Sequence, residues 1–243
     1  MDKEIKGEEK VDTNYTDNNH IILVGKVTSE KTFSHEVYGE RFYIFKIEIP
    51  RLSGTSDIIP ITVSERLLVS DDLVVGEKIV VKGQFRSYNT YIDNKNRLIL
   101  TVFAKDLITE KNFTEEQEEW EKQNISNEVV LNGYVCKAPI YRQTPFKREI
   151  ADILLAVNRA YNKSDYIPCI AWGRNARYCQ NMEVGTCVKI VGRVQSRIYE
   201  KKYEDGTIEE RVAYEVSVGS MEIVNENNDS EAEETPTENQ EAI

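Results

Sequence analysis

The chain has 243 residues, enough for one large domain or for two of about 100–120 residues. Its net charge of −11 argues against a nucleic-acid ligand, because proteins that bind nucleic acids usually present a basic surface. No run of about 18 apolar residues is present, so we expect no membrane span. Residues 1–8 lack the apolar stretch of a secretory signal, and the four cysteines are too few for a disulfide framework, which fits a reduced cytoplasm.

The negative charge is concentrated in three segments. Residues 1–18, 110–126 and 225–243 carry net charges of −3, −4 and −7, whereas residues 19–109 and 127–224 carry +1 and +2. The two long blocks are therefore close to neutral, and the objection to nucleic acid weakens.

The three acidic segments are predicted to lie outside the folded blocks. The final segment, 225–243, mixes Glu, Asn, Thr, Ser and Pro with few apolar residues, so we expect disorder there, and we expect the same of residues 1–18. Thr114 and Gln117 form a capping-box pattern ahead of a Glu-rich run, which predicts a short, solvated helix in the connector 110–126.

The two near-neutral blocks are copies of one another. Three separated segments match at offsets of 108, 108 and 109 residues: 19–27 with 127–135, 57–61 with 165–169, and 75–83 with 184–192. Agreement of three segments at nearly one offset predicts two tandem domains of the same fold, at 19–109 and 127–224.

Each copy has the pattern of a small β-protein. In the second copy, Val- and Ile-rich runs between turn signals predict strands at 128–135, 150–158, 166–172, 187–194 and 211–218. Residues 174–182 have helical spacing of apolar residues, and Asp205-Gly206 predicts a hairpin turn. Five strands with one helix between the third and fourth describe an OB-fold barrel. We therefore predict an all-β chain of two five-stranded OB-folds, with a small antiparallel sandwich as the alternative.

The second copy carries five motifs in one order, at 127–133, Pro139 with 142–145, 155–159, 170–174 and 191–200. In these motifs it resembles the bacterial single-stranded DNA-binding protein family. The resemblance covers residues 127–224, and the first copy matches only through its glycines and strand pattern. It implies a bacterial, cytoplasmic, nucleoid-associated protein of the type with two OB-folds per chain, which forms homodimers with four OB domains.

The resemblance implies four aromatic residues that stack on bases, namely Tyr161, Tyr166, Trp172 and Tyr199. Stacking on single strands is physically plausible for any sequence, because every base has a π-face, and each stacked base contributes about 1–3 kcal/mol. Tyr166 and Trp172 are six residues apart, so in a regular strand they point to one face. Cations that flank this set would contact phosphates, and we add Tyr88 of the first copy to the candidates. The cationic candidates are Arg142, Arg159, Arg174, Arg197, Lys201 and Lys202.

The first copy lacks most of these aromatics. In the repeat alignment, Ser53, Ile58 and Ser64 stand where the second copy has Tyr161, Tyr166 and Trp172, and Tyr88 matches Tyr199 only after a two-residue gap. We therefore hypothesise that the first copy is degenerate, mainly structural, and binds DNA weakly. The alternative is a shifted aromatic set consisting of Phe33, Tyr38, Phe42, Tyr43 and Tyr91.

The predicted function is protection of single-stranded DNA in replication, recombination and repair, without enzymatic activity, metal or cofactor. Asp165 is interpreted as a turn or cap residue. Replication or repair proteins are candidate partners, but the acidic tail ends in Glu241-Ala242-Ile243 and lacks the family's Pro-Phe tip, which weakens that expectation. The alternatives are an OB-fold interaction module of a primosome or mobile element with little affinity for nucleic acid, and RNA as the ligand.

Overall fold

The computed structural model describes residues 18–68, 73–92, 95–115, 126–203 and 205–224. Apart from Asn18, both predicted terminal segments lie outside the described residues, as does most of the connector. Of the helix expected after Thr114, only Glu115 is described. Within the described part, no helix is long and apolar enough to cross a membrane. The described strands fall inside the two predicted blocks, whose exact boundaries as domains stay a prediction.

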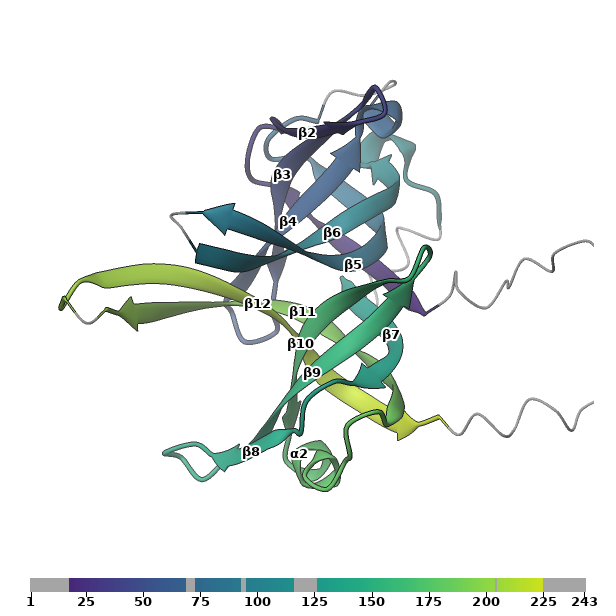
Figure 1. Cartoon of the computed structure of the whole chain (residues 1–243). Helices are drawn as coiled ribbons and strands as arrows, with labels where there is room; N and C mark the ends of the chain where they lie inside the picture. The colour runs from purple at the N-terminus through teal and green to yellow at the C-terminus, as the bar shows by residue number, and fades with distance from the viewer. Residues whose placement is uncertain (1–17, 69–72, 93–94, 116–125, 204, 225–243) are drawn as a thin grey trace, which may run out of the picture.

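The second repeat contains the predicted strands and helix, with one strand added. Its elements are β7 (Asn127–Val135), β8 (Ile140–Gln143), β9 (Glu149–Arg159), β10 (Lys163–Trp172), α2 (Arg174–Cys179), β11 (Cys187–Lys202) and β12 (Ile208–Ile223). Strand β8 was not predicted, because only four residues pair and none of them is buried. β11 and β12 continue well beyond the predicted ends into a long hairpin arm (Figure 1).

The first repeat has the same order of elements. It contains β1 (Asn19–Val27), β2 (Thr32–Val37), β3 (Glu40–Pro50), β4 (Ser56–Ser64), the 3-10 helix η2 (Glu65–Leu68), β5 (Lys78–Ile92) and β6 (Lys95–Thr109), followed by the 3-10 turn η3 (Glu110–Asn112). Its short helix also lies between the third and fourth barrel strands, so the repeat seen in the sequence is a repeat of topology.

Each repeat closes into a five-stranded barrel with a sixth strand at its edge. The hydrogen-bonded order is β2-β3-β4-β6-β5-β1 in the first repeat and β8-β9-β10-β12-β11-β7 in the second, and the additional pairs β1–β3 and β7–β9 close the two barrels. The parallel pairs β4–β6 and β10–β12 are short. These barrels confirm the OB-fold prediction over the small-sandwich alternative.

Gly25 and Gly133 are equivalent in the repeat, and each lies where its barrel closes. A Cβ on Gly133 would lie 2.5 Å from the carbonyl oxygen of Ala156, and one on Gly25 would lie 2.6 Å from that of Glu48. Any side chain there would collide with the neighbouring backbone, which explains why both copies keep glycine.

The two barrels join through antiparallel pairing of their first strands. Ile21 of β1 lies opposite Val129 of β7, and these residues are equivalent in the repeat, so the pair is centred on an approximate two-fold axis. Both side chains are fully buried. The two barrels therefore form an internal pseudo-dimer, and the long arms β5–β6 and β11–β12 extend to the same side of the molecule (Figure 1).

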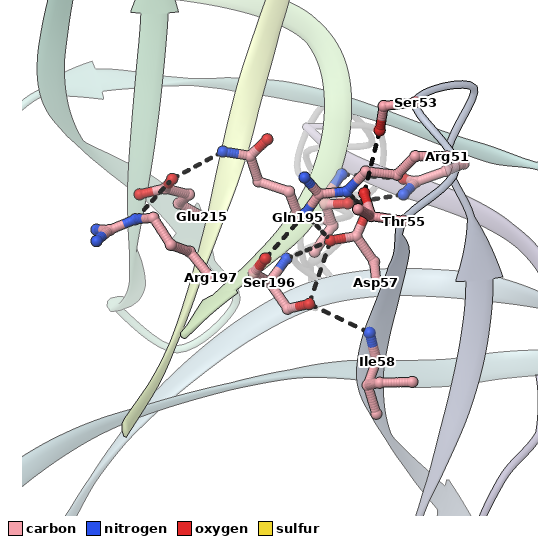
Figure 2. A network of polar contacts seen from close by, with 11 residues as sticks. Arg51, Ser53, Thr55, Asp57, Ile58, Gln195, Ser196, Arg197 and Glu215 are labelled. Carbon is pink, nitrogen blue, oxygen red and sulfur yellow. Dashed lines mark hydrogen bonds and ion pairs between the residues drawn. The ribbon is translucent and has the colours of Figure 1, made fainter. Parts of the chain in front are cut away.

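Hydrogen bonds between side chain and backbone repeat across this junction. The backbone N–H of Ser196 donates to Asp57 over 2.6 Å, and the hydroxyl of Ser196 accepts from the N–H of Ile58 over 3.2 Å (Figure 2). In the same way, the N–H of Ser87 donates to Asp165 over 2.7 Å, and the N–H of Tyr166 donates to the Ser87 hydroxyl. Asp165 is therefore a buried junction residue, and its interpretation as a turn or cap residue was wrong.

An arginine lies beside each aspartate, but its hydrogen bonding differs between the two halves. Arg51 donates two hydrogen bonds to Asp57 and a third, of 2.8 Å, to the carbonyl oxygen of Ser196. The Nε atom of Arg159 lies 3.5 Å from the fully buried carboxylate of Asp165, too poorly placed for a hydrogen bond. Burial therefore raises the pKa of Asp165, although the Ser87 N–H and Arg159 act in the opposite direction.

Candidate nucleic-acid interface

Strand β10 presents two of the candidate aromatics to solvent. Tyr166 and Trp172 have exposed fractions of 45% and 39%, whereas Ile167, Cys169 and Ala171 on the alternate positions are buried in the barrel. Because successive side chains of a strand point to opposite faces, one face of β10 belongs to the core and the other carries both aromatic rings. An exposed Trp or Tyr on such a strand is available to stack on a planar ligand.

The other two candidates lie outside β10: one precedes it in the chain, and the other is on β11, from which β12 separates it in the sheet. Tyr161 is almost fully exposed in the turn from β9 to β10, where it and Asn162 adopt the left-handed conformation. Tyr199 lies on β11, and the guanidinium of Arg197 is 5.8 Å from its ring centroid, within the range of a cation–π contact. All four predicted aromatics of the second repeat are therefore at the surface.

The six candidate cations divide into two groups. Arg174 and Lys202 are exposed and have no ion pair with any residue that the structure describes. The others have partners: Arg142 pairs with Asp152, Arg159 with Asp165, Arg197 with Glu215, and Lys201 lies 5.2 Å from the ring centroid of Tyr203. Arg159 pairs with the buried Asp165 at the junction of the repeats, so its predicted contact with a ligand stays a prediction.

A buried glutamate at this face was not identified from the sequence. Glu215 of β12 is 8% exposed, accepts a hydrogen bond of 2.7 Å from Gln195, and lies 3.7 Å from the Nε atom of Arg197 (Figure 2). It orients the arginine that covers Tyr199. Because Glu215 sits within an apolar alternating strand, its sequence context gave no sign of a polar partner on β11.

The first repeat has no aromatic on the strand that matches β10. Ile58 of β4 occupies the place of Tyr166, and Ser64 that of Trp172, as the repeat alignment predicted. The equivalence of Ser87 and Ser196 at the junction shows that the alignment continues without the two-residue gap. Tyr88 therefore matches Arg197, and not Tyr199 as predicted, although it remains exposed on β5.

The shifted aromatic set of the first repeat is split by the fold. Phe33, Tyr38 and Tyr91 are exposed, but Phe42 is buried beneath His35, with ring centroids 4.8 Å apart, and Tyr43 packs against the core. Two of the five rings therefore serve packing, and the remaining three lie on separate elements.

Comparison with known proteins agrees with this fold. A profile of the single-strand binding protein family matches residues 126–224. The single-stranded DNA-binding protein of Clostridium tetani is 39% identical over 100 residues, which span 37% of this chain and 68% of that protein. Single-stranded DNA-binding protein 3 of Clostridium acetobutylicum is 37% identical over 116 residues, which span 44% of this chain and 78% of that protein.

A solved structure extends the likeness to both repeats. The wild-type single-stranded DNA binding protein from Thermus aquaticus superimposes with a TM-score of 0.64 at 17% identity, over 91% of this chain and 96% of that one. At this identity the likeness shows the fold alone. Fold and surface together define a tandem OB-fold protein with an exposed aromatic face. The identities to the clostridial proteins go further: the chain belongs to the single-strand binding protein family.

Proposed function

We propose that this protein binds single-stranded DNA, without strong sequence preference, by stacking bases on Tyr161, Tyr166, Trp172 and Tyr199. The observation that carries the proposal is the solvent face of β10, which holds two exposed rings on a strand whose other face is core. A duplex hides the faces of its bases, so this surface favours single strands. The names of the clostridial relatives state the same ligand.

The phosphates of the strand would be contacted by cations around the rings. Arg174 begins α2 directly after Trp172 and Gly173, and Lys202 ends β11 on the long arm. Arg197 already covers Tyr199, so a base and a guanidinium would share that ring. Binding of this kind weakens with added salt, because each phosphate contact releases counterions.

The proposal is tested by measuring anisotropy of labelled oligo-dT, a duplex of the same length and oligo-U. We expect tight binding of oligo-dT and little binding of the duplex. Equal affinity for the duplex would mean that the protein binds DNA by non-specific electrostatic attraction and not by base stacking. Tighter binding of oligo-U would make RNA the ligand, and no binding at low salt would favour the interaction-module alternative.

We infer roles in DNA replication, recombination and repair from this binding, since each process exposes single strands. The first repeat, 19–109, would act mainly as the structural partner of the second, 127–224, because its β4 strand carries no aromatic. The acidic segments 110–126 and 225–243 would stay away from DNA by charge repulsion.

We propose that two chains associate into a homodimer. The hairpin arms carry exposed apolar side chains that a second chain would cover. Light scattering should give twice the chain mass of 28.0 kDa, and a clean monomer mass would contradict the dimer. The exposed apolar residues of the arms are Tyr91, Leu98, Ile198, Ile208 and Val212.

A further inference from the structure

A pocket of about 650 Å³ lies at the junction of the two repeats. Its walls come from β1, the β3–β4 hairpin and the start of β5 in the first repeat, and from Asn127 and Arg193 in the second. The lining is partly apolar, with Ile49 and Leu52, and partly charged. No residue of the predicted site lies in it.

The charges that line this pocket are mainly positive. Lys26 of β1 lies directly opposite Lys78 of β5 on one side and Glu48 of β3 on the other. Arg193 approaches from β11, and both it and Lys26 are exposed without an ion pair to any described residue. The remaining lining charges, Arg51 and Asp57, are hydrogen-bonded to each other. Two exposed cations, Lys26 and Arg193, therefore face one carboxylate, that of Glu48, which favours an anionic ligand.

The approximate two-fold axis supplies an internal comparison. Tyr134 occupies the place of Lys26, opposite Cys187 in place of Lys78 and Ala156 in place of Glu48. Gln84 occupies the place of Arg193, and it is buried. The fold therefore does not require cations at these positions, and their presence in one half only points to a ligand on that side.

One row of side chains connects the pocket to the aromatic surface. On β11, Arg193, Gln195, Arg197 and Tyr199 alternate with Val194, which is buried in the barrel. They therefore share one face of the strand, and the row from Arg193 to Tyr199 is about 20 Å long. This face is exposed at Arg193, Arg197 and Tyr199, whereas Gln195 between them is buried against Glu215. A strand of DNA that stacks on Tyr199 can follow this row toward the pocket.

We propose that the pocket binds backbone phosphates of the same single strand whose bases stack on the second repeat. Lys26 and Arg193 would neutralise the phosphates where the strand passes from the second repeat to the first. The inference rests on the proposed function and adds a second contact region to it. It also gives the first repeat a part in DNA binding that needs no aromatic on β4.

The test uses the full chain with Lys26→Gln and Arg193→Gln combined. Its matched control combines Arg66→Gln with Lys137→Gln, which removes the same charge from exposed positions outside the pocket and the aromatic surface. Affinity is measured against salt for an oligo-dT of about 8 nucleotides, within the span of one OB-fold, and for one of about 30 nucleotides. Circular dichroism shows whether each variant is folded.

For the long oligonucleotide, we expect the pocket variant to show a shallower slope of log affinity against log salt, by about 0.7 for each lost phosphate contact. The slope of the control variant should stay unchanged. The short oligonucleotide should bind all three proteins alike. An unchanged slope with intact short-oligonucleotide binding would overturn the pocket while leaving the proposed function standing. Tighter DNA binding by the pocket variant would mean that an acidic segment of the chain occupies the pocket, which also overturns the inference. If the unmodified chain binds neither oligonucleotide, both the pocket inference and the proposed function are wrong.

Discussion

Alanine in place of Trp172 is expected to weaken binding of oligo-dT by about 1–3 kcal/mol, which is about 5- to 150-fold. The ring is on the solvent face of β10 and outside the buried core cluster, so we expect the loss to come from stacking and not from unfolding. Tyr199→Ala should have an effect of the same order. Anisotropy of a labelled oligonucleotide measures the affinity of each variant.

The control for this loss is Tyr178→Ala. Tyr178 is also an exposed aromatic, but it lies on α2 and outside the solvent face of β10. Its replacement should leave the affinity unchanged. If Tyr178→Ala and Trp172→Ala reduce affinity equally, the β10 face is not the binding surface.

Alanine in place of Asp57 is expected to lower the free energy of unfolding by about 3–5 kcal/mol, the usual cost of removing one partner from a buried ion pair. The substitution leaves Arg51 without its carboxylate and removes the acceptor of the Ser196 N–H, so both repeats lose a contact. Urea unfolding followed by circular dichroism measures the change. A cost below about 1 kcal/mol, the size of an ordinary hydrogen bond, would contradict this account of the junction.

Asp165→Ala is the matched variant, and it should cost less. Asp165 has the same place in the repeat, but Arg159 lies beyond hydrogen-bonding distance and burial raises the pKa of the carboxyl. In the folded chain it therefore retains its proton at pH values where the unfolded chain has lost it. The advantage of the natural residue over alanine is greatest below the unfolded pKa and falls as pH rises through the folded pKa. An advantage that grows with pH over this range would contradict the sign.

Much of the fold was readable from local patterns. The alternation in β10 and the spacing of the repeated glycines follow from the burial of one strand face and from the closure of each barrel. These are properties of neighbouring residues, so one sequence shows them. The outer parts of β11 and β12 were not predicted because their exposed residues, such as Ile198 and Ile208, have no core face to impose alternation.

The residues that join the repeats were not readable in this way. Asp57 and Ser196 are 139 positions apart, and no local pattern links an aspartate after a turn to a serine on a distant strand. The cationic pocket has the same origin, since Lys26 and Arg193 meet only when the barrels pair through β1 and β7. The repeat pointed only to the aspartate contacts, by keeping aspartate at both equivalent positions, 57 and 165.

The most direct test of the account is a fluorescence titration of the full chain with oligo-dT, alongside its Trp172→Phe variant. The chain has two tryptophans, and phenylalanine keeps a stacking ring at position 172 while removing its indole. We predict strong quenching of the natural protein by the single strand, little by a duplex, and loss of most of the quench in the variant while anisotropy still reports binding. Binding by anisotropy with an unchanged emission from Trp172 would contradict the base-stacking surface on β10.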